Sequence, residues 1–243
     1  MVLAMIKESP RGGVPVAGVA PPSRLHPVDA DDPRQATFAH DINNPLAIVT
    51  TNLDFVLDEL EAGRSGEDLH AAIRDARDAA ERIATLADGF RTRSNQHDEA
   101  PLSSTVGLAG PKGGSGALCG IARILIVDDE PSLGAALRRC LRDYDVVVTV
   151  SGQEALAQLT KGERFDVILC DVTMPKMSGD ELYAEIQRVV PEQVERIVFI
   201  TGGAMTERTR KFIATVPNPV VDKPFDVKNL REMIRTRIRA RAR

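Results

Sequence analysis

Residues 124–130 are Ile-Leu-Ile-Val-Asp-Asp-Glu, a short apolar run that ends in three consecutive acids. A continuous run of aliphatic residues is typical of a strand buried on both faces of a parallel sheet. The acids then lie at the carboxyl end of that strand, where open α/β sheets bind their ligands. This segment predicts a doubly wound α/β domain with a functional site at the end of its first strand.

Three further apolar runs each end in a polar side chain. The runs are 165–170, 197–200 and 220–222, and the residues that follow them are Asp171, Thr201 and Lys223. Acids that converge at one edge of a sheet need a cation, and hard carboxylate oxygens suit Mg²⁺. A hydroxyl and an ammonium group beside them would contact an oxyanion. The combination predicts a site that carries a phosphoryl group on an aspartate.

Residues 121–243 resemble the receiver domain of two-component response regulators. The resemblance rests on Asp128, Asp129, Asp171, Thr201, Lys223 before Pro224, and the Met-Pro-Lys-Met-Ser-Gly loop at 174–179. It implies a five-stranded parallel sheet with helices on both faces. One departure is Val220, because many receivers have an aromatic residue there that swings inward on phosphorylation. The resemblance therefore leaves open how a phosphorylated state would signal.

The same resemblance assigns a role to each site residue. Asp171 would be the nucleophile that accepts phosphate. Asp129 and Asp171 would bind Mg²⁺ directly, Asp128 would help through water, and the Thr173 carbonyl would be a further ligand. Thr201 and Lys223 would stabilise the phosphoryl oxygens. Phosphoryl transfer is mainly positioning and charge neutralisation, which these groups provide. The bond between Lys223 and Pro224 is a candidate for the cis form.

Residues 34–94 contain two helical repeats separated by the Gly-Arg-Ser-Gly break at 63–66. Apolar residues of the first repeat alternate at spacings of four and three: Ile42, Leu46, Val49, Leu53, Val56 and Leu60. A similar pattern runs from Leu69 to Phe90. These repeats predict an antiparallel helical hairpin. Its wide apolar face predicts that two hairpins pair as a four-helix bundle in a homodimer.

His40 lies outside that apolar seam and beside Asp41, so an imidazole faces solvent next to an acid. The segment resembles the phosphoacceptor box of histidine kinases through His40-Asp41, Asn44 and Pro45-Leu46. By this resemblance His40 would carry a phosphoryl group on a ring nitrogen, and Asp41 would act as acid/base or fix the tautomer. Asn44 would position a water that removes phosphate from an aspartate.

Residues 95–120 are rich in Gly, Pro, Ser and Ala, which predicts a flexible linker. A segment of this length cannot hold an ATP-binding domain. We therefore expect a phosphorelay protein that moves phosphoryl groups between His40 and Asp171, with the kinase ATP domain supplied in trans. One alternative is a truncated hybrid sensor kinase that acts as a phosphatase or phosphate sink. Another is a non-enzymatic dimeric adaptor.

Composition bounds the remaining expectations. Residues 1–33 are rich in Pro, Gly, Val and Ala without periodicity, which predicts disorder. The absence of an apolar run of membrane-spanning length predicts a cytoplasmic protein without a membrane partner. A net charge of −4 gives no general attraction to DNA. The expected partners are a histidine kinase or phosphotransfer protein and a downstream response regulator. Cys170, next to Asp171, is expected to be a small core residue.

Overall fold

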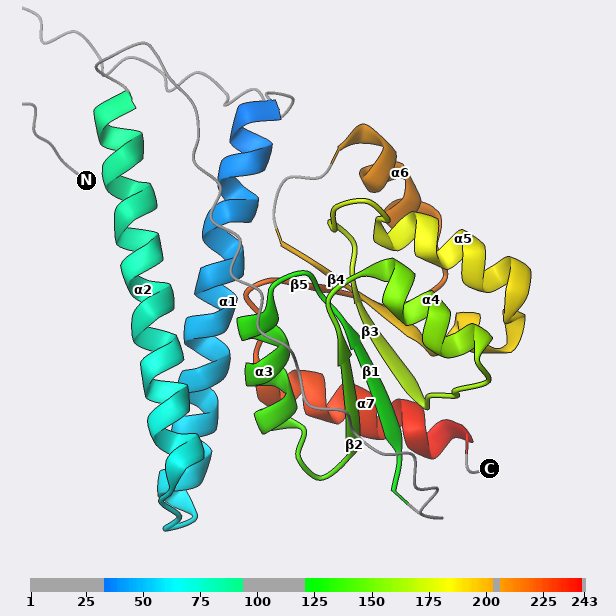
Figure 1. Ribbon diagram of the computed structural model, residues 1–243, viewed down its shortest axis with the longest axis horizontal. Coiled ribbons are helices and arrows are strands. Elements are labelled where there is room, and N and C mark those ends of the chain that lie inside the picture. The colour runs from blue at the N-terminus through cyan, green and yellow to red at the C-terminus, as the bar shows by residue number, and fades with distance from the viewer. Residues whose placement is uncertain (1–32, 94–120, 203–205, 242–243) are drawn as a thin grey trace, which may run out of the picture.

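The computed structural model describes residues 33–93, 121–202 and 206–241, which form a helical hairpin and an α/β domain (Figure 1). The hairpin consists of α1 (Pro33–Glu61) and α2 (Glu67–Arg93). Gly63 begins the turn between them with a φ of 65°, a left-handed conformation that glycine adopts without steric cost. The predicted hairpin and its break are confirmed. The predicted disordered segment, apart from Pro33, and the predicted linker lie outside the described residues.

The α/β domain is built on a parallel sheet with the strand order β2-β1-β3-β4-β5. The strands are β1 (Arg123–Val127), β2 (Asp145–Thr149), β3 (Val167–Asp171), β4 (Ile197–Thr201) and β5 (Val220–Asp222). The helical segments are α3 (Pro131–Cys140), α4 (Gly152–Thr160), α5 (Gly179–Val189), the 3₁₀ turn η1 (Pro191–Arg196), α6 (Glu207–Thr215) and α7 (Val227–Arg241). The order reverses between β1 and β3, so the sheet has the switch point at which doubly wound folds bind ligands.

Apolar side chains fill both faces of the sheet, as expected for parallel strands covered by helices on each side (Figure 1). On one face Ile124 and Ile126 pack with Leu133 of α3 and Ile234 of α7. The other face packs against α4 and α5, and its core also includes Cys170. Cys170 is buried as predicted, and burial raises the pKa of its thiol well above the usual value.

The hairpin packs directly against the α/β domain, and α1 lies along α3 (Figure 1). Ala47 and Ile48 of α1 join the core under α3 and α7. A second apolar cluster is shared by the two parts: Phe55, Val56 and Ala72 from the hairpin, with Cys140 and Val227 from the α/β domain. The flexible linker predicted no fixed arrangement, but these buried contacts define one.

The face of α1 that the chain buries differs from the predicted seam. The side chains turned inward include Asn44, Ile48, Thr51, Phe55 and Glu59, which recur every three or four residues. Leu53 and Leu60 were assigned to the seam, yet they remain about half exposed in the single chain at 47% and 58%. The receiver-facing side of the helix therefore carries several polar groups, and an apolar stripe is left at the surface. Among the helices that the structure describes, none is long and apolar enough to span a membrane.

Candidate phosphoryl-acceptor site

The polar residues predicted from the strand ends converge at one edge of the sheet. Asp128 and Asp129 follow β1, Asp171 ends β3, and Thr201 ends β4. Lys223 follows β5, and its peptide bond to Pro224 is cis, in agreement with the sequence expectation. The Lys223 amide donates to the Thr201 carbonyl at 2.6 Å, so the sheet ladder places the lysine beside β4.

Lys223 is the centre of the charge network. Its Nζ donates to Asp171 Oδ2 at 2.6 Å and to Asp128 Oδ2 at 2.9 Å. The side chains of Lys223 and Asp171 are fully buried, and Asp128 is only 2% exposed. Burial alone would lower the pKa of Lys223, but the charges of Asp128 and Asp171 outweigh it and raise that pKa. The lysine therefore stays protonated and holds the two carboxylates together.

Backbone amides fix the remaining oxygens of the two acids. Thr173 N donates to Asp171 Oδ1 at 3.0 Å, and Glu130 N donates to Asp128 Oδ1 at 2.9 Å. Burial raises the pKa of Asp128 to about 7, an effect that Lys223 opposes and Asp171 reinforces.

A divalent cation fits the acids at this edge. Asp128, Asp129 and Asp171 can each offer a carboxylate oxygen, with all three oxygens within 4.8 Å of one another. A set of hard oxygen donors of this kind suits Mg²⁺. Thr173 adjoins Asp171 through its backbone N–H, and the role of its carbonyl as a further ligand stays a prediction.

Thr201 shows where a further ligand would be received. Its hydroxyl oxygen is buried and has no hydrogen-bond partner within the described part of the chain. Buried polar groups are usually paired, so an unpaired hydroxyl beside a buried lysine and aspartate marks a place for an acceptor such as a phosphoryl oxygen. The predicted contact of Thr201 with a phosphoryl oxygen stays a prediction.

The loop after β3 passes very close to the acceptor aspartate. A Cβ atom at Gly179 would lie 2.7 Å from the Asp171 carbonyl oxygen and 2.9 Å from Val172 Cα. Only glycine permits this approach, because the neighbouring atoms belong to the backbone. Lys176 in the same loop has a φ of 67°, a left-handed conformation that is uncommon for a residue with a side chain. The loop is therefore closely fitted to the end of β3.

One residue of the site comes from the hairpin. Asn44 Oδ1 accepts a hydrogen bond from Lys223 Nζ at 3.1 Å, and Asn44 is only 9% exposed. The sequence singled out Asn44 as a functional residue of the hairpin but did not predict that it meets Lys223 of the same chain. Gly202 makes room for the contact, since a Cβ there would be 3.2 Å from Lys223 Cδ and 3.3 Å from Asn44 Oδ1.

The other predicted hairpin residues are less closely defined. Asp41 is exposed on α1. His40 belongs to α1, but its side chain lies outside the described residues. The structure thus unites Asp128, Asp129, Asp171, Thr201 and Lys223 with Asn44.

Comparison with known proteins agrees with this geometry. The family model for the response regulator receiver domain matches residues 124–235. This part of the chain is a receiver domain. A response regulator receiver protein of Anaeromyxobacter sp. strain Fw109-5 is 37% identical over 103 residues, which are 40% of this chain and 43% of that protein. The sensor kinase CckA of Brucella abortus is 33% identical over 116 residues, 46% of this chain and 12% of that protein.

A solved structure gives a similar match. The chemotaxis protein CheY4 of Vibrio cholerae is 30% identical, with 48% of this chain and 98% of CheY4 covered and a TM-score of 0.42. The chain spans less than half of each of the two curated relatives above. The family match begins after the hairpin, so the histidine-kinase resemblance of residues 34–94 stays a prediction.

Proposed function

We propose that this chain is a phosphorelay protein in which Asp171 of the receiver domain exchanges a phosphoryl group with His40 of the hairpin. The observation that carries the proposal is the Lys223 ammonium group. It contacts Asp128 and Asp171 of the receiver and Asn44 of the hairpin at the same time. The two parts of one chain therefore meet at the acceptor carboxylate.

The receiver residues have defined tasks in this proposal. A carboxylate oxygen of Asp171 attacks the donor phosphorus, a new P–O bond forms, and the bond from phosphorus to the donor atom breaks. Lys223 and the Thr201 hydroxyl bind the equatorial oxygens. Mg²⁺, held by Asp128, Asp129, Asp171 and the Thr173 carbonyl, would supply charge neutralisation when bound.

The periodicity of α1 relates the proposed phosphoryl donor, His40, to Asn44. Residue 40 precedes Asn44 by four positions in α1, and positions four apart share one face of a helix. Because Asn44 is in the site, helix periodicity would bring position 40 to the receiver edge in this proposal. Asp41 would assist as acid/base at the imidazole. The ATP domain that phosphorylates His40 would belong to a partner histidine kinase or phosphotransfer protein.

A direct test is phosphorylation of the full chain by a small phosphodonor. Purified protein incubated with phosphoramidate and Mg²⁺ should gain a base-labile phosphoryl group, and mass spectrometry should place it on Asp171. Asp171→Asn should abolish it, whereas Asp222→Asn, which changes an exposed acid at the end of β5, should not. A chain that gains no acyl phosphate would contradict the proposal.

A second function is favoured by the position of Asn44. In this alternative to the relay, the hairpin stays docked on the phosphorylated receiver, and the Asn44 amide orients a water toward the acyl phosphate, so the hairpin would act as a phosphatase on its own receiver. Asn44→Ala should then lengthen the lifetime of phosphorylated Asp171. Asn43→Ala is the matched control, because it removes the same side chain one position away. Equal lifetimes in wild type and Asn44→Ala would exclude this activity.

The surface of the hairpin supports the proposed homodimer. Leu53, Leu57 and Leu60 on α1 and Ile73 on α2 are exposed by 47–58%. The three leucines of α1 recur at helical spacing and are exposed to solvent, which is typical of a helix that packs against a partner helix in a bundle. A dimer would cover them without disturbing the face of α1 that meets the receiver. A purely adaptor role would instead predict that His40→Ala is silent in cells.

A further inference from the structure

The number of hydrogen bonds that Lys223 can donate limits what the site can hold at once. A lysine ammonium group has three N–H donors and no acceptor. In this structure all three have a partner: Asp171 at 2.6 Å, Asp128 at 2.9 Å and Asn44 at 3.1 Å. The Asn44 contact is the longest and involves an uncharged acceptor. It is the contact that a stronger acceptor would displace most easily.

A phosphoryl group on Asp171 is such an acceptor. It places charged oxygens within reach of Lys223, and charge-assisted hydrogen bonds are roughly twice as strong as neutral ones. Asn44 faces Lys223 with its carbonyl oxygen, because lysine can only donate. All three N–H donors of Lys223 are occupied, so a phosphoryl oxygen must take one from Asp171, Asp128 or Asn44, and the uncharged Asn44 oxygen is the weakest of these acceptors.

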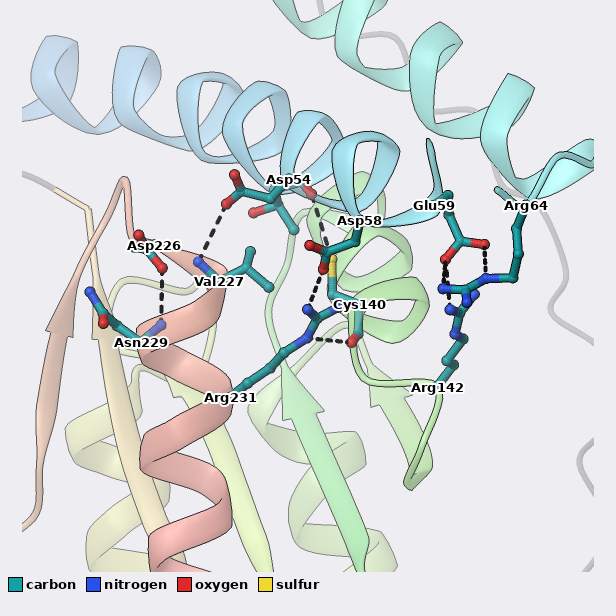
Figure 2. A network of polar contacts seen from close by, with 11 residues as sticks. Asp54, Asp58, Glu59, Arg64, Cys140, Arg142, Asp226, Val227, Asn229 and Arg231 are labelled. Carbon is teal, nitrogen blue, oxygen red and sulfur yellow. Dashed lines mark hydrogen bonds and ion pairs between the residues drawn. The ribbon is translucent and has the colours of Figure 1, made fainter. Parts of the chain in front are cut away.

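Hairpin docking combines that contact with the buried apolar cluster around Phe55 and Val227 and with several polar contacts. Figure 2 shows the interface at the end of α1: Arg231 of α7 pairs with Asp58, and Val227 N donates to Asp54 at 3.4 Å. Glu59 is held by Arg64 at 2.7 Å and by Arg142 at 2.6 Å. Nearer the site, Arg139 of α3 bridges Asn52 and Asp75 at 2.6 Å each. Interfaces between two parts of one chain resemble transient contacts unless they are large and hydrophobic, and the polar contacts here are the part of the interface that a change of charge at the site can affect.

We propose that phosphorylation of Asp171 and docking of the hairpin oppose each other, with Lys223 as the shared element. The unphosphorylated receiver holds α1 through Asn44, and the phosphorylated receiver takes Lys223 away and releases it. This inference rests on the proposed function of Asp171. Release of the hairpin would also signal the phosphorylated state. Val220 cannot do so in the way of the aromatic residue that many receivers have at this position.

The coupling has a reciprocal consequence. If a phosphoryl group weakens docking by some factor, docking must weaken binding of a phosphoryl mimic by the same factor. Couplings between sites in one protein are typically of the order of tenfold. A chain whose hairpin is held less firmly should therefore bind the mimic roughly tenfold more tightly.

Hydrogen exchange of the full chain tests the inference. Amides of α1 from 46 to 58 and of α3 should exchange faster after Mg²⁺ and beryllofluoride, a phosphoryl mimic, are added. Amides of α4 and α5, on the opposite face of the sheet, serve as the internal reference. Unchanged or slower exchange of α1 with the mimic bound would overturn the inference.

Two variants and one control variant give the reciprocal measurement. Asp58→Ala removes the pair with Arg231, far from the acceptor site, and should tighten beryllofluoride binding roughly tenfold. Glu61→Ala, an exposed acid near the end of the same helix, should leave it unchanged. Asn44→Ala should also tighten binding, and it should abolish the effect of the mimic on exchange. Identical affinities in all four proteins would contradict the coupling.

The two proposals fail in different ways. If Asp171 accepts phosphate from phosphoramidate and binds the mimic but α1 exchange stays constant, only the coupling is wrong. If Asp171 neither accepts phosphate nor binds the mimic, the proposed function falls and the coupling with it.

Discussion

Lys223 donates hydrogen bonds to two buried acids, and its surroundings show which parts of a site can be predicted from a sequence. Asp128, Asp171, Thr201 and Lys223 were identified because parallel strands deliver their carboxyl ends to one edge. Asn44 was also singled out, but its contact with Lys223 spans 179 positions and depends on tertiary packing. No local pattern encodes such a pairing.

Thr201 permits a test that separates stability from function. Thr201→Val removes a buried hydroxyl that has no partner among the residues that the structure describes, so the free energy of unfolding should stay constant or rise by up to about 1 kcal/mol. Phosphorylation of Asp171 by phosphoramidate should slow by about tenfold or more. Thr149→Val is the control, because the Thr149 hydroxyl donates to the Ile126 carbonyl at 3.2 Å. It should destabilise the fold and leave the rate unchanged.

Asp128 gives the site a pH dependence. Its pKa is raised from 3.8 to about 7, chiefly by burial, so the folded state keeps a proton that the unfolded chain loses. Without Mg²⁺, this group makes the free energy of unfolding fall as pH rises from about 4 to about 7. Mg²⁺ needs the carboxylate anion, so its stabilising effect should be larger at about pH 8 than at about pH 5.5. Thermal unfolding with and without Mg²⁺ measures both effects. Equal Mg²⁺ stabilisation at the two pH values would refute this reasoning.

Elements were predicted more accurately than their packing. The repeats of residues 34–94 located both helices and the turn, because apolar periodicity is a local property. They did not identify which face of α1 is covered. Thr51, Asn52 and Glu59 are buried although they are polar, since Arg139, Arg142 and the Cys140 region of the receiver provide partners or cover. Apolar periodicity cannot reveal a polar interface.

The end of α1 offers a test of that interface. Hydrogen bonds from Arg64 and Arg142 lower the pKa of Glu59 to about 2 from 4.5. A depressed pKa stabilises the folded state above about pH 4.5, and the contribution is lost as pH falls toward about 2. Glu59→Gln should therefore lower the free energy of unfolding by about 1 kcal/mol at neutral pH, with a smaller difference in acid. Urea unfolding measures this, and Glu61→Gln is the control. A constant difference across this pH range would contradict the assigned pairing.

At the scale of the whole molecule, the way in which the hairpin docks on the receiver could not be predicted from the sequence. The composition of segment 95–120 predicts a flexible linker and therefore no fixed arrangement of the two parts. The ion pairs between them join residues that lie far apart in the sequence, as Arg139 and Asp75 do. The shared cluster around Phe55 and Val227 is equally invisible in either part alone. The fold of the receiver could be predicted from local sequence patterns. The docking of the hairpin depends on tertiary contacts between two surfaces, which local patterns do not contain.

The exposed stripe of the hairpin makes a prediction about assembly. Sedimentation of the full chain should show a dimer, and Leu57→Glu should shift it toward monomer, because a charge at the centre of an apolar seam is costly to bury. Val150→Glu, at an exposed apolar position of the receiver, should leave the dimer intact. Stable dimers persist at roughly tens of micromolar protein. A wild-type chain that stays monomeric in that range would contradict the proposed dimer.

The most direct test of the account follows one phosphoryl group within one chain. The full chain is phosphorylated on His40 with phosphoramidate in the absence of divalent metal, the small donor is removed, and Mg²⁺ is added. The account predicts that base-stable phosphohistidine at position 40 declines as base-labile acyl phosphate at Asp171, or its hydrolysis product, appears. In Asp171→Asn the phosphohistidine should persist. Phosphohistidine that is equally stable in wild type and Asp171→Asn would contradict the account.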